Sequence, residues 1–98
     1  MPESIIQKIQ GYLSTQPVDK AWLFGSYARN EYTPDSDVDI LVRYTDSDSL
    51  SLLDICRISV GLEKMINKKV DLVEEGCLMP FAENSVNKDK ILIYERTA

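Results

Sequence analysis

Three aspartates interrupt short apolar runs of this chain and limit how it can fold. Asp37 and Asp39 begin a run that continues to Val42, and Asp71 lies inside the sequence Val-Asp-Leu-Val at residues 70–73. Side chains alternate between the two faces of a strand, so Asp37 and Asp39 share one face, about 7 Å apart by the strand rise. An unpaired buried carboxylate costs several kcal/mol. The fold must therefore expose these carboxylates to solvent or gather them around a cation.

Apolar periodicity and turn residues predict the other elements. Four short runs are predicted strands, the last favoured over a final helical turn, at residues 21–24, 37–44, 70–73 and 91–94. Helices are predicted at residues 3–15, 27–30 and 78–87, with one long helix ending near Ile66. That long crossover allows the second and third strands to lie parallel and adjacent, which brings Asp71 to the face of Asp37 and Asp39. We expect one α/β (α+β) domain over residues 1–98, with a small mixed sheet of three to four strands packed with helices.

The long helix has competing start signals and a predicted core face. Its N-cap is expected at Ser47 or Ser49, and a weaker alternative is a capping box between Ser51 and Asp54. Asn67 is expected to end the helix in a left-handed conformation. The residues predicted to face the core are Leu52, Ile55, Cys56, Leu62 and Ile66.

A Gly-Ser pair ends the first predicted strand. Gly25 lets the backbone turn tightly or come close to a ligand, and Ser26 is a natural N-cap for the short helix that follows. Because the first N–H groups of a helix point at whatever lies beside its N-terminus, the turn is a candidate phosphate site. The simpler alternatives are a plain turn for this pair and a solvated strand face for the Asp-x-Asp motif.

Charge and composition exclude several classes of function. The formal net charge of −5 argues against a general nucleic-acid binder, which presents a basic surface to phosphates. The N-terminus lacks an apolar signal core and no run reaches about 18 apolar residues, so we expect a cytoplasmic protein without a membrane partner. There is no histidine, and Cys56 and Cys77 have no motif spacing. We therefore expect buried free thiols and no zinc site.

Three aspartates without histidine favour a hard divalent cation. Oxygen ligands select Mg²⁺ or Mn²⁺ over Zn²⁺. Such ions can clamp the attacking and leaving oxygens of a phosphoryl or nucleotidyl transfer. The residues alone therefore predict a metal-and-phosphate site built from Asp37, Asp39, Asp71 and the Gly25-Ser26 turn.

Three segments carry a combined motif that is more specific than its parts. They are Gly-Ser-Tyr-Ala-Arg-Asn at residues 25–30, Ser-Asp-Val-Asp-Ile-Leu-Val at 36–42 and Lys-Val-Asp-Leu-Val at 69–73. In this combination the chain resembles the minimal nucleotidyltransferases of the DNA polymerase β-like superfamily, over nearly its whole length. One departure is Asn30, where glycine is usual. Asparagine tolerates left-handed backbone, so the turn is expected to survive.

The resemblance implies a role for each aspartate and a set of cofactors. Asp37 and Asp39 match the two metal-binding carboxylates. Asp71 matches the third, which helps to hold the catalytic metal and accepts a proton from the attacking hydroxyl. The implied cofactors are two Mg²⁺ ions, with Mn²⁺ as the alternative, and ATP as the nucleotide donor.

The resemblance also implies phosphate contacts around these aspartates. Gly25-Ser26 matches the phosphate-contacting turn, Ser36 adds a hydroxyl, and Arg29 fits a position for a basic residue near the phosphates less closely. The alternative for Arg29 is a surface residue that pairs with Glu31 or Asp35.

Three functions follow from this resemblance. The leading one is an antitoxin that transfers AMP from ATP to a hydroxyl, typically tyrosine, of a partner HEPN-domain ribonuclease toxin. The second is a non-catalytic antitoxin that neutralises the toxin by occlusion. The third, a small-molecule nucleotidyltransferase, is disfavoured by size, since such relatives generally carry an additional helical domain. Assembly into a homo- or hetero-oligomer stays open.

Overall fold

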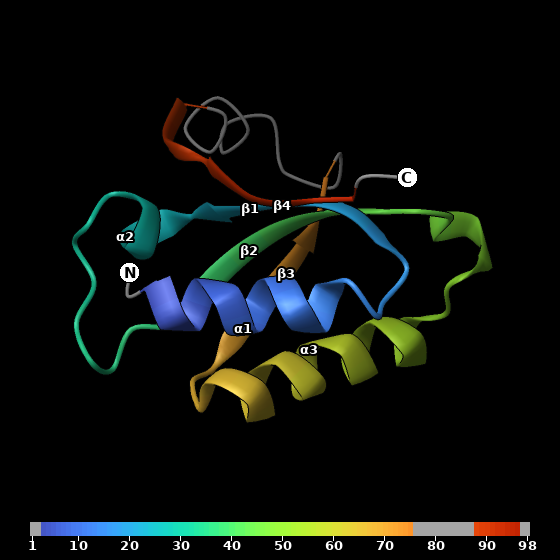
Figure 1. The fold of residues 1–98 in the computed structure, drawn as a ribbon, viewed down its shortest axis with the longest axis horizontal. Helices are drawn as coiled ribbons and strands as arrows, with labels where there is room; N and C mark the ends of the chain where they lie inside the picture. The colour runs from blue at the N-terminus through green and yellow to red at the C-terminus, as the bar shows by residue number, and fades with distance from the viewer. Residues whose placement is uncertain (1–2, 76–87, 97–98) are drawn as a thin grey trace.

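One four-stranded sheet with two helices packed on one face forms the frame of the protein (Figure 1). The computed structural model describes residues 3–75 and 88–96. The strands are β1 (Val18–Phe24), β2 (Val38–Tyr44), β3 (Val70–Glu74) and β4 (Ile91–Glu95). The helices are α1 (Glu3–Leu13), α2 (Gly25–Ala28) and α3 (Leu52–Ile66), with a short 3₁₀ turn η1 (Ser47–Ser49). The predicted α/β class with a small mixed sheet is confirmed, and the predicted helix at 78–87 lies outside the described residues.

The strands run in the order β3-β2-β1-β4. β2 and β3 are parallel, as predicted from the long crossover, whereas β1 pairs antiparallel with both β2 and β4. Residues 91–94 therefore lie in a strand, as favoured from the sequence. This order leaves β2 in the interior of the sheet with β3 at its edge, so both strands that carry the aspartates are neighbours.

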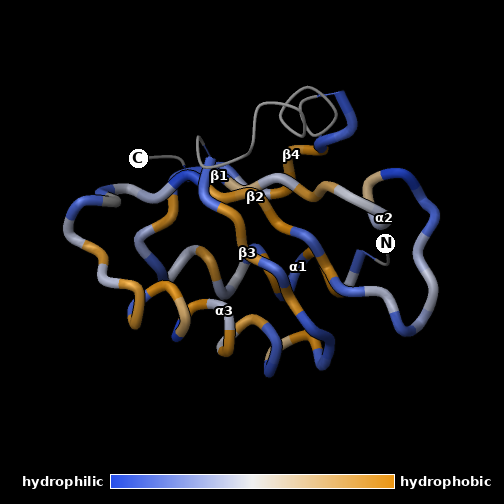
Figure 2. Tube along the Cα trace, turned by 180° about the vertical axis from the view of Figure 1, so that it is seen from behind, coloured by the Kyte–Doolittle hydropathy of each residue, from blue (hydrophilic) through white to orange (hydrophobic). Residues whose placement is uncertain are grey.

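The core lies between the sheet and the two helices. Val38 and Ile40 of β2 are fully buried, whereas Asp37 is exposed and Asp39 is half-buried. The predicted alternation thus holds at the start of β2, whereas further along the strand Leu41, on the face of Asp39, is also buried. Apolar residues follow the strands and recur along α3, where Leu52, Leu53, Val60 and Met65 are exposed, and hydrophilic residues occupy much of the connection from α2 to β2 (Figure 2).

The core face of α3 differs in part from the prediction. Leu62 and Ile66 are buried and Ile55 is half-buried, as expected. Ile58 completes their stripe, because the spacings of three and four residues keep these side chains on one face. Leu52 is 77% exposed and Cys56 is also exposed, so their assignment to the core was wrong. The two lie one turn apart on the other face of the helix. Cys77 lies outside the described residues.

The N-cap of α3 is Ser51, and the favoured candidates Ser47 and Ser49 lie in η1 instead. The Ser51 side chain accepts a hydrogen bond from the Asp54 N–H at 3.2 Å. In return the Asp54 carboxylate accepts one from the Ser51 N–H at 3.0 Å. This capping box also lowers the pKa of Asp54, because its ionised form is the acceptor. Asn67 ends the helix with φ 56° and ψ 42°, as predicted.

Substituting this cap gives a first prediction. Ser51→Ala is expected to lower the free energy of unfolding by about 1 kcal/mol, because two helix N-terminal donors lose their reciprocal arrangement. Urea unfolding followed by circular dichroism measures the change. Ser49→Ala is the control, because Ser49 precedes the helix and its hydroxyl donates only to the Asp46 carbonyl oxygen, an exposed bond of 2.9 Å. A loss as large as that in Ser51→Ala would contradict the assignment of the cap.

Helices α1 and α3 touch where Gly61 faces Tyr12. A β-carbon added at Gly61 would overlap the Tyr12 hydroxyl and ring. Glycine therefore leaves room for the Tyr12 side chain between the two helices, at a cost of about 1 kcal/mol relative to alanine within a helix.

Candidate active site

The parallel pairing of β2 and β3 brings the aspartates together. Asp39 lies directly opposite Asp71 in the register of the two strands. Asp37 precedes β2 by one residue and shares the face of Asp39 by alternation. On its other side Asp39 lies opposite Phe24, the last residue of β1. The structure thus places Asp39 between the third aspartate and the start of the Gly-Ser turn.

Gly25 meets the carboxylate of Asp39 directly. Its φ is 70°, and a β-carbon built on it would overlap Asp39 Oδ2 and come within 3.1 Å of Asp39 Cγ. Both the backbone conformation and the space therefore require glycine. The sequence predicted a tight turn or a close approach to a ligand here. The observed neighbour is the site's own carboxylate, which the turn holds against the end of β1.

Asp39 lies in an environment that disfavours its ionised form. Burial raises its pKa above the ordinary value of 3.8, and the nearby charges of Asp71 and Asp37 raise it further. The positive charge of Arg29 acts in the opposite direction. Repulsion from two other carboxylates is the electrostatic cost of gathering three acids, and a divalent cation would remove it.

This shift predicts how stability depends on pH in the absence of divalent cations. Above pH 3.8 and up to the raised pKa of Asp39, the folded protein binds more protons than the unfolded chain, so stability falls as pH rises. Asp39→Asn removes this charge and is expected to increase the free energy of unfolding at pH 7. The difference from wild type should vanish below about pH 3, where both states are protonated. Urea unfolding at the two pH values tests this, and a variant that is equally destabilised at both would refute it.

Ser26 differs from its predicted local role. It lies inside α2, which begins at Gly25, and the N-cap position is taken by Phe24, whose side chain forms no capping bond. Ser26 therefore does not cap the helix. It is half-buried in the turn beside Asp39, and its placement there as a phosphate contact stays a prediction.

Arg29 and Ser36 lie near the aspartates but have protein partners. Arg29 pairs with Glu31 at 3.2 Å, one of the two partners expected for a surface role, and with Asp89 at 3.6 Å. Ser36 accepts a hydrogen bond from the Thr33 N–H at 2.9 Å and so closes the turn before Asp37. The positive charge of Arg29 still stabilises the ionised form of Asp39, because it lowers the pKa of that carboxyl group.

The connection from α2 to β2 has an anchor that the sequence reasoning missed. Tyr27 and Tyr32 stack with ring centroids 4.3 Å apart, and Tyr27 is only 3% exposed. Asn30, between them, has φ 59°, so it adopts the left-handed backbone expected for its position. Their five-residue spacing gives no periodic signal, because it fits neither strand nor helix.

The donor set fits a magnesium-type ion in its chemistry. Asp37, Asp39 and Asp71 offer only oxygen ligands and are close enough for their charges to act on one another. As the side chains stand, no group of three or more acidic or cysteine residues within 3–75 and 88–96 is placed so that it could hold a metal ion. The exposure of Asp37 and Asp71 leaves both side chains room to rotate toward a shared ion.

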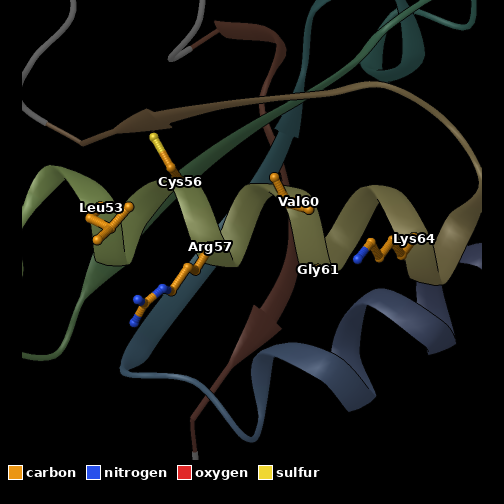
Figure 3. A pocket seen from close by; sticks show the side chains of 6 residues that line it. All are labelled: Leu53, Cys56, Arg57, Val60, Gly61 and Lys64. Atoms are coloured by element: carbon orange, nitrogen blue, oxygen red, sulfur yellow. The ribbon is translucent and has the colours of Figure 1, made fainter.

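A hollow of about 410 Å³ lies along α3, separate from the three aspartates. Figure 3 shows the side chains that line it, which come from α3 alone: Leu53, Cys56, Arg57, Val60, Gly61 and Lys64. It contains no carboxylate and none of the predicted site residues. In the described part of the chain, no helix is long and apolar enough to cross a membrane.

The fold and this arrangement of carboxylates beside a glycine turn define a nucleotidyltransferase domain. A family profile described as "Polymerase beta, Nucleotidyltransferase" matches residues 7–98. A curated protein of Methanocaldococcus jannaschii, named as a candidate protein adenylyltransferase, is 40% identical over 88 residues, which cover 90% of this chain and 87% of that protein. The chain belongs to the polymerase β nucleotidyltransferase family.

Two solved structures share the fold. One is a toxin–antitoxin with AMP-PNP, with TM-score 0.78 and 22% identity over 94% of this chain and 74% of that one. The other contains a tri-AMPylated HEPN toxin of Shewanella oneidensis in complex with its MNT antitoxin, with TM-score 0.73 and 21% identity. That likeness covers 98% of this chain and 74% of the matched one.

Proposed function

We propose that this chain is a cytoplasmic, metal-dependent protein adenylyltransferase that moves AMP from ATP onto a tyrosine of a HEPN-domain ribonuclease toxin, and so acts as its antitoxin. The observation that carries the proposal is the placement of Asp39 directly between Asp71 and Gly25. Support for the protein acceptor comes from the name of the 40%-identical relative, and support for the partner from the AMPylated HEPN toxin bound to a protein of the same fold.

In this proposal Asp37, Asp39 and Asp71 would hold two Mg²⁺ ions. The bound ions would neutralise the three carboxylates and the phosphate charge, which an acidic chain could not otherwise attract. The Gly25-Ser26 turn contacts the terminal phosphates through its backbone N–H groups, with Arg29 and Ser36 nearby. Arg29 would have to exchange its bonds to acidic neighbours for a phosphate, which its exposure permits.

The proposed reaction is one in-line displacement at the α-phosphorus of ATP. The tyrosine oxygen forms a bond to that phosphorus, the bond to the bridging oxygen breaks, and pyrophosphate leaves with the electron pair. Asp71 accepts the proton of the hydroxyl. Its exposed position at the sheet edge allows a protein acceptor to approach it.

Labelled ATP tests the proposal directly. The purified chain is incubated with Mg²⁺, labelled ATP and a HEPN-domain protein encoded beside it, and the modified residue is located by mass spectrometry. We expect an AMP adduct on a tyrosine of the partner, which is absent when EDTA is added. Lack of transfer, when calorimetry shows that Mg²⁺ and ATP are bound, would overturn the enzyme proposal.

A further inference from the structure

A polar pocket lies beside the aspartates at the β3 edge of the sheet. Its volume is about 280 Å³, and two short segments line it. One segment is the turn before β2, and the other connects α3 to β3. The lining residues are Pro34, Asp35, Ser36, Asp37, Asn67, Lys68 and Lys69. One wall thus contains Asp37, a proposed metal ligand. The other contains Lys68 and Lys69, which the proposed reaction does not use.

The backbone around the lysines is held in place. Asn67 turns the chain in a left-handed conformation at the end of α3, which directs Lys68 and Lys69 toward the start of β3. The Val38 N–H then donates a hydrogen bond to the Lys69 carbonyl oxygen at 2.8 Å. Since Val38 pairs with Val70, Lys69 lies beside Asp37.

The charges of the two lysines are available to a ligand. Lys69 is exposed and Lys68 half-buried, and across the described parts of the chain neither side chain takes part in an ion pair. Their surroundings are acidic, with three aspartates close by and a net charge of −5. Two cations at the rim of an acidic site favour the entry of an anionic group on the side of β3.

The strand order indicates whether the anionic group at the lysines belongs to ATP or to the acceptor protein. Gly25 follows β1, the lysines precede β3, and Asp39 on β2 lies between them. In an in-line nucleotidyl transfer the attacking and leaving oxygens lie on opposite sides of the phosphorus. With the leaving pyrophosphate at the Gly25-Ser26 turn, the acceptor enters from the β3 side, where Asp71 and the lysines lie.

We propose that Lys68 and Lys69 form an acceptor subsite that binds an acidic side chain of the protein substrate close to its target hydroxyl. The inference rests on the proposed function, because that function places the triphosphate at the opposite flank. The lysines then select the acceptor by charge and leave the affinity for ATP unchanged.

Peptide binding tests the subsite without requiring transfer. Two fluorescein-labelled tyrosine peptides are compared by anisotropy, one with glutamates beside the tyrosine and one with glutamines. Wild type is expected to bind the glutamate peptide about fivefold more tightly, the value of an exposed ion pair near its upper limit. In K68Q/K69Q this preference should disappear, while the affinity for the glutamine peptide is retained.

A matched variant and a second ligand make the result decisive. K8Q/R57Q also removes two positive charges, from exposed positions on α1 and α3, and should keep the preference for glutamate. No preference in wild type, or an equal preference in K68Q/K69Q, would overturn the subsite. A weaker affinity of K68Q/K69Q for ATP with Mg²⁺, measured by calorimetry, would assign the lysines to the triphosphate instead and equally refute it. Failure of the proposed function is seen separately, as absence of AMP transfer by wild type.

Discussion

Replacement of Asp39 by asparagine is expected to abolish nucleotidyl transfer, with kcat/KM lowered about 1000-fold or more. Asp39 is the central carboxylate, in register with Asp71 and held against Gly25. An amide of the same shape loses the charge that would hold the cation, and each tenfold in rate corresponds to about 1.4 kcal/mol of transition-state stabilisation. The rate is measured with labelled ATP and the partner protein. Asp48→Asn, in the exposed η1 turn, is the matched control and should retain full activity.

Substitution of both Asp37 and Asp39 separates the enzyme from a non-catalytic antitoxin. D37N/D39N is expected to lose protection of cells against the co-expressed toxin, although the two proteins still form a complex. If neutralisation persists undiminished while AMP transfer is absent, the protein acts by occlusion. Circular dichroism of D37N/D39N checks that the double variant is folded, so that loss of activity is not confused with loss of the fold.

Gly25→Ala is expected to lower transfer about 100-fold and to destabilise the fold by at least about 1 kcal/mol. Two causes act together at this position. Alanine disfavours the φ of 70°, and its β-carbon would displace the Asp39 carboxylate from the place that the turn gives it. Displacement of a catalytic group by about 1 Å is sufficient for a loss of this size.

Gly11→Ala provides the contrast for this prediction. Gly11 lies within α1, and a β-carbon added there meets no atom within 4 Å. This variant should gain up to about 1 kcal/mol of stability, as expected for an exposed helix position, with unchanged activity. Thermal unfolding and the transfer assay are run on both variants. A fully active Gly25→Ala would show that the turn does not position Asp39.

The sheet and its aspartates could be predicted because strand patterns and a parallel crossover leave few arrangements. Once β2 and β3 are adjacent and parallel, Asp71 lies opposite Asp39, and the alternation of strand side chains places Asp37 on the same face as Asp39. Local signals of similar strength were harder to rank. Serine is a good N-cap at any of the positions 47, 49 and 51, and the structure selects Ser51, which forms the reciprocal capping box with Asp54.

Other misses depended on which face of a helix packs against its neighbours. The apolar positions of α3 cover more than one face, so Leu52 and Cys56 were as plausible in the core as Ile58. Likewise, nothing in the sequence around Gly25 shows that its closest neighbour is Asp39, because that contact depends on the register of β1 with β2. Contacts made across strands are set by the assembled sheet and not by the segment alone.

The register of β3 on β2 also determines whether a misfolded form of the chain would be stable. Because strand side chains alternate with a period of two, a slip by one residue would turn Asp71 toward the core and Val70 toward water. Such a misregistered chain would lack its third carboxylate and would also bury an unpaired charge, so it would be both inactive and unstable. The burial of Val70 therefore favours the same register that places Asp71 opposite Asp39.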